Sequence, residues 1–304
     1  MIKSRITLKQ LEALVQVVDQ GTFRKAALAL GTTQPNVSAR IASLETVLDV
    51  VLMHRDAGSV RLTATGAELV TAARAVIRSG EAFLEVADRR DLMEDRLRLG
   101  VTELVACTWL HDFLRRFRAV YPSVKVALQV DLAHEIDRQM AVGALDLVLQ
   151  SGAKPDQSAA CTPIGTAPYA WLAIPKTAET IGRSPRMATV FDQSILTHAR
   201  HTQAVQELEA FADAGGFDKG QIVNSSSLAS CLPMAMDGMG VALLPKPLVQ
   251  DAVAAGTLVE LSCDWTPSAL ETYSRFDPDR SARFVAKASA LAAQAAARFD
   301  DQQN

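Results

Sequence analysis

The chain has 304 residues, and 49% of them are hydrophobic. This length exceeds that of one small domain, and the apolar share is enough for more than one buried core, so we expect two or three units. No apolar run approaches the roughly 18 residues of a membrane span, and the N-terminus lacks the layout of a signal peptide. These features predict a cytoplasmic protein with no membrane partner.

Charge is unevenly distributed along the chain. The net charge of −3 argues against a protein that coats nucleic acid without specificity. Residues 1–62, however, hold eight Lys or Arg against five Asp or Glu, a surplus of +3 that leaves −6 for the remainder. A basic N-terminal module on an acidic body is typical of a DNA-binding head joined to a regulatory body.

The four cysteines are widely separated and form no C-x-x-C pair. This spacing argues against a disulfide framework or a zinc site. We expect the cysteines to be small buried hydrophobes rather than a redox switch. They are Cys107, Cys161, Cys231 and Cys263.

Residues 21–45 predict two short helices joined by a tight turn at Gly31. Thr22 precedes the first of them as a natural cap, and either Thr32 or Thr33 can cap the second. Small polar side chains lie off the apolar stripe of the second helix, which is the helix-turn-helix pattern. We expect the second helix to enter the major groove of DNA. Its apolar stripe is formed by Val37, Ile41, Leu44 and Leu48.

A winged head and a long helix complete the N-terminal part. A further helix precedes Gly21, and residues 50–63 read as two short strands around a turn at 56–59. The long helix that starts near Thr63 has a heptad-like apolar seam, and we favour pairing with a second copy over packing on its own body. The charged run at 88–96 predicts an exposed hinge. The seam consists of Gly66, Leu69, Ala73, Val76, Gly80, Phe83 and Ala87.

Strands and helices alternate in the rest of the chain. This order predicts two α/β units with parallel sheets and right-handed crossovers, and the chain returns to the first unit at its end. The predicted strands are 96–101, 124–130, 145–150, 168–175, 221–225, 241–245 and 269–276, and the predicted helices are 104–120, 135–142, 202–214, 228–237, 247–255 and 281–299.

The head resembles that of LysR-type transcriptional regulators. The matching residues are Gly21-Thr22-Phe23, Ala26-Ala27, Thr33-Gln34-Pro35, Ser38, Ile41 with Leu44-Glu45, and Leu62-Thr63 with Gly66, and the resemblance extends to Tyr121-Pro122 and residues 238–245 in the body. It implies an α/β protein with an all-α, winged helix-turn-helix N-terminal domain, a dimerising linker helix and a two-lobed, periplasmic-binding-protein-like (type 2) effector domain. It also implies a dimer of dimers, with RNA polymerase as a further candidate partner.

The predicted helices, strands and charged run set the corresponding domain boundaries. We expect the DNA-binding domain at 1–62, the linker helix at 63–88, the hinge at 89–95 and the effector domain at 96–304. Within the last, lobe 1 covers about 96–163 and 267–304, and lobe 2 covers about 164–266.

The candidate DNA contacts divide into readers of bases and binders of phosphate. Gln34 and Ser38 are the predicted base readers, Asn36 is evenly balanced between reading a base and a solvated position, and Pro35 lies beside them in the first turn. The alternative is an ordinary solvated helix face. Ala39 stands where relatives often carry a longer polar side chain, so readout there should be weaker or different. Thr22, Arg24 and Arg40 are expected on phosphates, and Arg55 in the minor groove or on a phosphate.

Candidate effector contacts lie where strands of the body end, because ligands of such folds bind at the carboxyl ends of strands. The resemblance implies that Thr102 contacts an effector carboxylate. Glu103 either faces the cleft, which favours an amine, amide or zwitterion, or caps its own helix. The remaining candidates are Ser151, Asn224 and Ser226, with Thr197 and His198 from the second lobe, although a surface position is the more common one for such a histidine.

A competing class is an enzyme or a small-molecule-binding protein on the same fold with no role on DNA. His198 and His201 have helical spacing but lack an acidic or cysteine partner for a metal. Cys107 and His111 are spaced as a nucleophile and base within one predicted helix, which suggests packing rather than catalysis. No phosphate-binding or hydrolase motif occurs. We therefore expect no catalytic residue, metal or cofactor, and predict a regulator that binds a near-palindromic DNA operator as a homodimer under the control of a small-molecule effector.

Overall fold

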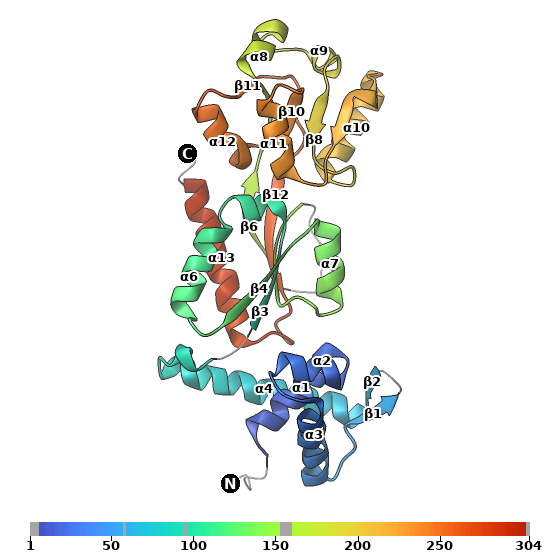
Figure 1. Ribbon diagram of the computed structural model, residues 1–304, viewed down its shortest axis with the longest axis vertical. Helices are drawn as coiled ribbons and strands as arrows, with labels where there is room; N and C mark the ends of the chain where they lie inside the picture. Colours follow the sequence, from blue (N-terminus) through green and yellow to red (C-terminus); the bar gives the residue numbers. More distant parts are fainter. Residues whose placement is uncertain (1–5, 57–58, 94–95, 153–159, 302–304) are drawn as a thin grey trace. The chain divides into compact units, whose positions relative to one another are not determined.

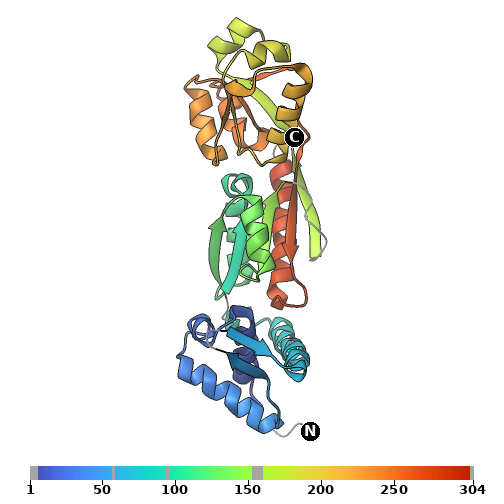
Figure 2. The ribbon, with the colours of Figure 1, turned by 90° about the vertical axis from the view of Figure 1, so that its right-hand side faces the viewer.

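The computed structural model describes residues 6–56, 59–93, 96–152 and 160–301 (Figures 1 and 2). The chain forms two compact units. The first comprises Met1–Asp95 with Tyr121–Val124 and Asp277–Ala286, and the second comprises Arg96–Val120, Lys125–Phe276 and Lys287–Asn304. Within the described residues, no helix is long and apolar enough to cross a membrane.

The first unit is a winged helix-turn-helix, as predicted. Its elements are α1 (Leu8–Gln20), α2 (Phe23–Ala29), α3 (Gln34–Leu48), β1 (Met53–Asp56), β2 (Ser59–Leu62), α4 (Ala64–Val86) and the 3-10 helix η1 (Arg90–Leu92). Strands β1 and β2 pair antiparallel as the wing. Ala57 and Gly58 of the predicted turn lie outside the described residues.

Short-range capping explains where the helices of the head begin and end. Thr7 and Gln10 form a capping box at the start of α1, and Gly21 ends that helix with a φ of 70°. Thr22 caps α2 as predicted, because its hydroxyl accepts the N–H of Lys25 at 3.2 Å. Thr33 occupies the cap position of α3 but makes no side-chain capping bond.

The start of α4 lies directly against the wing. The Thr63 hydroxyl accepts the N–H of Gly66 at 2.9 Å and donates to the carbonyl of Val51 at 2.8 Å. A Cβ added at Gly66 would lie 2.0 Å from the carbonyl oxygen of Leu52, so only glycine fits this contact. The Leu62-Thr63 and Gly66 motif therefore joins the linker helix to the head.

The predicted seam of α4 is wrong in part, because three of its members, Gly66, Leu69 and Ala73, face the head. Gly66 and Ala73 are buried in the first unit, together with Val70. The small residues thus permit close approach of the head rather than of a second helix. The stripe that faces solvent keeps Val76 and Phe83 of the predicted seam and adds Ala72, Ser79 and Val86 at heptad spacing.

The second unit contains two lobes, each built on a five-stranded sheet (Figure 1). The first lobe contains β3 (Arg96–Val101), α5 (Glu103–Cys107), α6 (Leu110–Val120), β4 (Lys125–Val130), α7 (Ala133–Ala141), β5 (Leu147–Ser151), β6 (Ala160–Ala167), β12 (Leu270–Phe276) and α13 (Arg283–Asp301). Its strand order is β4-β3-β5-β12-β6. The return of the chain to this lobe through β12 is confirmed.

The second lobe has the strand order β11-β7-β10-β8-β9. Its apolar core surrounds Trp171, which is fully buried and donates through its indole N–H to the carbonyl of Trp265 at 2.8 Å. The lobe consists of β7 (Tyr169–Ala173), α8 (Pro175–Ile181), α9 (Met187–Phe191), β8 (Ile195–Thr197), α10 (Gln203–Gly215), the 3-10 helix η2 (Lys219–Gln221), β9 (Ile222–Asn224), α11 (Leu228–Met236), β10 (Val241–Pro245), α12 (Lys246–Ala254) and β11 (Val259–Leu261).

Two expectations for the body are corrected. The sheets are mixed rather than parallel, since β12 runs antiparallel to β5 and β6, and β7 runs antiparallel to β10 and β11. The predicted helix 104–120 is broken at Thr108, where the backbone leaves the helical region and the hydroxyl donates to the carbonyl of Leu104 at 2.7 Å. Cys107 and His111 therefore lie on either side of the break.

Candidate DNA-binding helix and interlobe site

Helix α3 separates into an anchored face and an exposed face. Val37, Ile41 and Leu44 are at most 1% exposed, so they fix the helix in the core of the head. The predicted contact residues lie on the other side. Gln34, Pro35 and Asn36 are exposed in its first turn, and Ser38 and Arg40 are half-buried.

Two polar contacts fix the orientation of α3 in the head. The Glu45 carboxylate accepts the backbone N–H of Leu52 at 2.8 Å, which ties the helix to the wing. The side-chain amide of Gln10 in α1 donates to the hydroxyl of Ser43 at 3.0 Å. Because Gln10 is itself buried, this bond fixes the position of α1 relative to α3. The exposed face of α3 is therefore held rigidly.

The predicted phosphate contacts lie on α2, α3 and the wing. Arg24 is exposed on α2, one residue after the half-buried Phe23. Thr22 uses its hydroxyl oxygen as a helix cap, which leaves the hydroxyl proton for donation. Arg55 lies on β1 opposite Val60, and its side chain is outside what the structure describes.

At the carboxyl ends of β3 and β5, the structure brings two predicted effector contacts together. The Thr102 hydroxyl accepts the backbone N–H of Ser151 at 2.9 Å, and both residues are buried. The Ser151 hydroxyl bonds to that of Thr272 at 3.0 Å. No local pattern in the sequence indicates Thr272, because β12 comes from the distant end of the chain.

Glu103 caps a helix of the other lobe instead of its own. Its carboxylate accepts the Ser227 hydroxyl at 2.7 Å and the N–H groups of Leu228 at 2.5 Å and Ala229 at 3.3 Å. These donors belong to the N-terminus of α11. The residue therefore faces the second lobe, and its carboxylate is already bound there.

Four further predicted residues lie at or just after the ends of β8 and β9. Thr197 is fully buried, and its hydroxyl donates to the carbonyl of Leu243 at 3.3 Å, so it supports the strand rather than lining an open surface. The Nε2 atom of His198 and the Oδ1 atom of Asn224 are buried without a hydrogen-bond partner among the described residues. Ser226 is exposed.

A surface position is the more common one for such a histidine, but His198 is half-buried. Burial lowers the pKa of its imidazole, although the nearby Glu103 carboxylate and a backbone hydrogen bond to Ser226 act in the opposite direction. A lowered pKa favours the neutral ring at pH 7, and a neutral ring can offer Nε2 as an acceptor.

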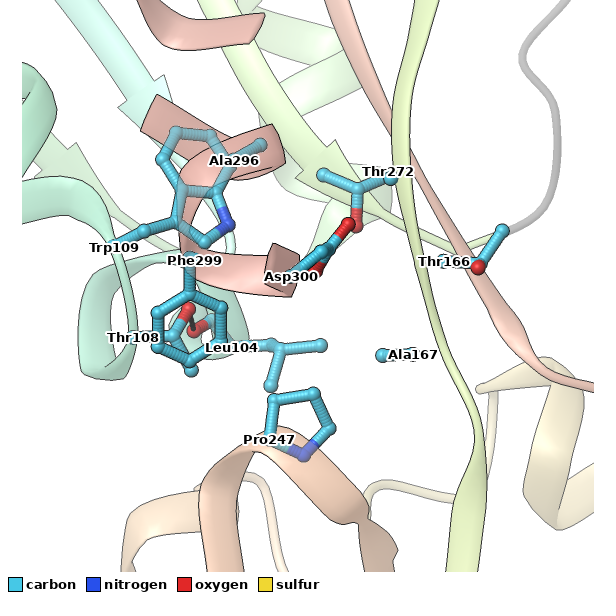
Figure 3. A pocket seen from close by; sticks show the side chains of 11 residues that line it. Leu104, Thr108, Trp109, Thr166, Ala167, Pro247, Thr272, Ala296, Phe299 and Asp300 are labelled. Carbon is cyan, nitrogen blue, oxygen red and sulfur yellow. Dashed lines mark hydrogen bonds between the residues drawn. The ribbon is translucent and has the colours of Figure 1, made fainter. Parts of the chain in front are cut away.

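A small pocket, partly open to solvent, lies where α5, α12 and α13 meet strands β6 and β12 (Figure 3). Trp109 and Phe299 form part of its apolar wall, and Asp300 and Thr272 add polar groups. Burial raises the pKa of Asp300. Sequence reasoning found none of these four, because they converge from elements far apart in the chain. The remaining lining residues are Leu104, Thr108, Gly165, Thr166, Ala167, Pro247 and Ala296.

The sequence led us to expect buried cysteines, but the structure buries them to different degrees. Cys231 is buried, Cys161 and Cys263 are half-buried and Cys107 is exposed, and all four thiols are free. Desolvation raises the pKa of the Cys107, Cys231 and Cys263 thiols, the last to about 11. Across residues 6–56, 59–93, 96–152 and 160–301, no group of three or more His, Cys, Asp or Glu side chains could hold a metal ion.

Comparison with known proteins identifies the family. Residues 8–67 match the model of the bacterial regulatory helix-turn-helix protein, lysR family, and residues 90–297 match that of the LysR substrate binding domain. The chain therefore belongs to the LysR family of transcriptional regulators, with an N-terminal helix-turn-helix domain and a C-terminal effector-binding domain.

Individual relatives agree with this assignment. The chain is 32% identical to the uncharacterized HTH-type transcriptional regulator YcgK of Bacillus subtilis over 56% of its own length and 52% of that protein. It is 27% identical to the DNA-binding transcriptional dual regulator OxyR of Escherichia coli over 85% of each chain. The full-length LysG of Corynebacterium glutamicum with bound effector Arg has the same fold, at a TM-score of 0.59 and 20% identity, covering 96% of this chain and 99% of that one.

Proposed function

We propose that this regulator binds a near-palindromic operator as a homodimer, or a dimer of two dimers, and that a small molecule held between the two lobes controls this binding. The exposed first turn of α3 carries the proposal, because it presents Gln34 and Asn36 on a rigidly anchored helix. In this proposal residues 1–62 bind DNA, 63–88 pair two copies and 96–304 bind the effector. RNA polymerase is a further partner, and contact with the chromosome places the protein in the cytoplasm.

The DNA contacts divide by chemistry. Gln34 and Ser38 are proposed to read base edges, and an amide such as that of Gln34 can pair with adenine through two hydrogen bonds. Asn36 donates to the Thr32 hydroxyl at 3.2 Å, an exposed bond that DNA can replace. Thr22, Arg24, Arg40 and Arg55 are proposed to bind phosphates or the minor groove and so to position the head.

Replacement of Gln34 and of Arg24 should separate these two roles. Gln34→Ala is expected to relax the preference at one or two operator positions, by about 1–3 kcal/mol at each. Arg24→Ala is expected to weaken binding to all sequences about equally and to reduce the salt dependence. Competition binding against single-base variants of the promoter fragment measures both. An unchanged preference profile for Gln34→Ala removes that residue from the set of base readers.

The effector site is proposed to favour a ligand with N–H donors. The Thr197 hydroxyl donates within the fold, whereas the His198 Nε2 and Asn224 Oδ1 atoms are acceptors without a partner among the described residues. An amine, amide or zwitterion can satisfy such acceptors, whereas a simple carboxylate cannot. A thermal-shift screen that compares amines and amino acids with simple carboxylates tests this preference. Stabilisation by simple carboxylates alone contradicts it.

Several relatives, including a protein of Mycobacterium avium with 30% identity over 80% of this chain, are described as hydrogen peroxide-inducible genes activators or probable ones. We propose that peroxide does not act through Cys107 here, because the nucleophilic species is the thiolate and burial raises the pKa of this thiol. Cys107, the exposed thiol, should therefore react slowly with peroxide at pH 7. DNA binding by wild type and Cys107→Ser should respond equally to peroxide treatment, as measured by mobility shift. A response that disappears only in Cys107→Ser contradicts this proposal.

The alternative of an enzyme on this fold receives less support. The break at Thr108 separates Cys107 from His111, so the one nucleophile-and-base spacing in the sequence does not lie on a continuous helix. His111 bonds through Nδ1 to the carbonyl of Thr108 at 3.2 Å. We therefore propose a regulator without catalytic activity.

A further inference from the structure

The Glu103 carboxylate fills an anion site at the N-terminus of α11. The first N–H groups of a helix have no partner within the helix and carry partial positive charge, so they bind anions. Here the N–H groups of Leu228 and Ala229 and the hydroxyl of Ser227 all donate to this one side chain. None of the three donors is a Lys or Arg. The helix terminus itself is therefore the principal partner of the charge.

The carboxylate and its donors come from different lobes. Glu103 begins α5 directly after β3, and the preceding residue, Thr102, is fixed to the first-lobe sheet by its bond with the N–H of Ser151. Ser227 is held in the second lobe by a bond from its N–H to the Ser225 hydroxyl at 3.1 Å. Hydrogen bonds to Glu103 thus link two anchored backbones, and separation of the lobes requires that they break.

Two neighbouring side-chain atoms do not offer this carboxylate another partner. Burial lowers the pKa of His198, which favours the neutral ring, and the unpartnered His198 Nε2 and Asn224 Oδ1 atoms are acceptors. Because acceptors do not bind a carboxylate, these two atoms favour its position at the helix terminus.

We propose that Glu103 is a tethered ligand, whose carboxylate occupies the anion site of α11 and holds the two lobes together until the carboxylate of a zwitterionic effector displaces it. The inference rests on the proposed function, because it concerns the interlobe site assigned there to the effector. A free small anion should be able to occupy the same site only when the tethered carboxylate is absent.

Chemical rescue tests this proposal in the full-length chain. Thermal unfolding is followed by tryptophan fluorescence, because Trp109, Trp171 and Trp265 all lie in the second unit. Glu103→Ala should lower the Tm by roughly 3–6 °C, as expected for the loss of a charged hydrogen-bonding group from a unit of this size. Sodium acetate at about 100 mM should restore most of this loss through mass action, whereas sodium chloride at equal ionic strength should not. Wild type should respond equally to the two salts.

A matched control is Glu207→Ala. The Glu207 carboxylate accepts the N–H of Ser268 at 2.7 Å in the second lobe, but Ser268 does not begin a helix. This variant should lose stability without rescue by acetate, so it measures any general effect of the salt. If Glu103→Ala does not fold, Glu103→Gln preserves the shape without the charge, and it should show a lowered Tm that acetate does not restore because the amide fills the site.

Three results for Glu103→Ala overturn the tethered-ligand proposal. They are an unchanged Tm, a lowered Tm that acetate does not restore, and stabilisation by acetate equal to that of wild type. Binding of the promoter fragment is measured in parallel on the same samples. A Glu103→Ala protein that binds DNA but shows no acetate rescue refutes the tethered ligand and leaves the proposed function standing, whereas wild type that binds no promoter fragment refutes the function itself.

Discussion

Gly66→Ala is expected to destabilise the winged head by about 3 kcal/mol, at the upper end of the usual cost of overpacking. The added Cβ would lie 2.0 Å from the carbonyl oxygen of Leu52 and 2.9 Å from its carbonyl carbon. These are backbone atoms next to the wing, and they cannot rotate away as a side chain can. The start of α4 must therefore shift, which disturbs the packing of Val70 and Ala73 in the head.

Gly80→Ala in the same helix is the matched control, with the opposite expected sign. The nearest heavy atom to its added Cβ is the Cδ1 of Leu8 at 4.0 Å, so the methyl group fits. Alanine is favoured over glycine within a helix by about 1 kcal/mol. Far-UV circular dichroism reports both effects, while tryptophan fluorescence, which reports only on the second unit, should change in neither variant. A Gly66→Ala head as stable as that of Gly80→Ala contradicts this account of the motif.

Phe83→Asp is expected to raise the dimer dissociation constant by at least about 100-fold. Phe83 is 73% exposed and Val86 is 89% exposed on the solvent face of α4, so both are proposed to lie at the contact between two copies. Burial of a Phe side chain contributes about 1.5–3 kcal/mol, and each dimer contains two of them. Operator binding should weaken in parallel, because two linked heads bind two half-sites more tightly than separate heads do.

Analytical ultracentrifugation measures this dissociation directly. Val223→Asp is the control, since Val223 is 41% exposed on β9 in the second lobe and is not part of the proposed contact. It should leave the association state unchanged. A Phe83→Asp protein that sediments as wild type at all concentrations contradicts pairing along α4.

The head could be predicted from sequence almost to the residue, because its signals are local. Apolar spacing and the caps Thr7, Thr22 and Thr63 fix where its helices begin. The seam of α4 was wrong in part for an equally physical reason. Helical periodicity identifies an apolar face but not what covers it, and Gly66 and Ala73 are covered by the head of the same chain.

The body was predicted less completely, because the elements absent from the prediction form only by pairing with segments far away in the sequence. Strand β6 reads ACTPIGTA, which lacks apolar alternation, and it exists through pairing with β12 from the end of the chain. The partners of Glu103 on α11 lie about 125 residues away, so no local pattern revealed which helix it caps. Thr102, Glu103 and Ser151 were nevertheless identified as candidates, because strand ends can be located from sequence alone.

Footprinting of the DNA fragment upstream of the protein's own gene tests the central claim, that two copies of α3 read one operator. The account predicts two protected half-sites, related by near two-fold symmetry, with centres at least about one helical turn apart. Protection should fall steeply as salt rises, since phosphate contacts release counterions. Protection that unrelated DNA of equal length removes as readily as the operator, or no protection at all, contradicts the claim.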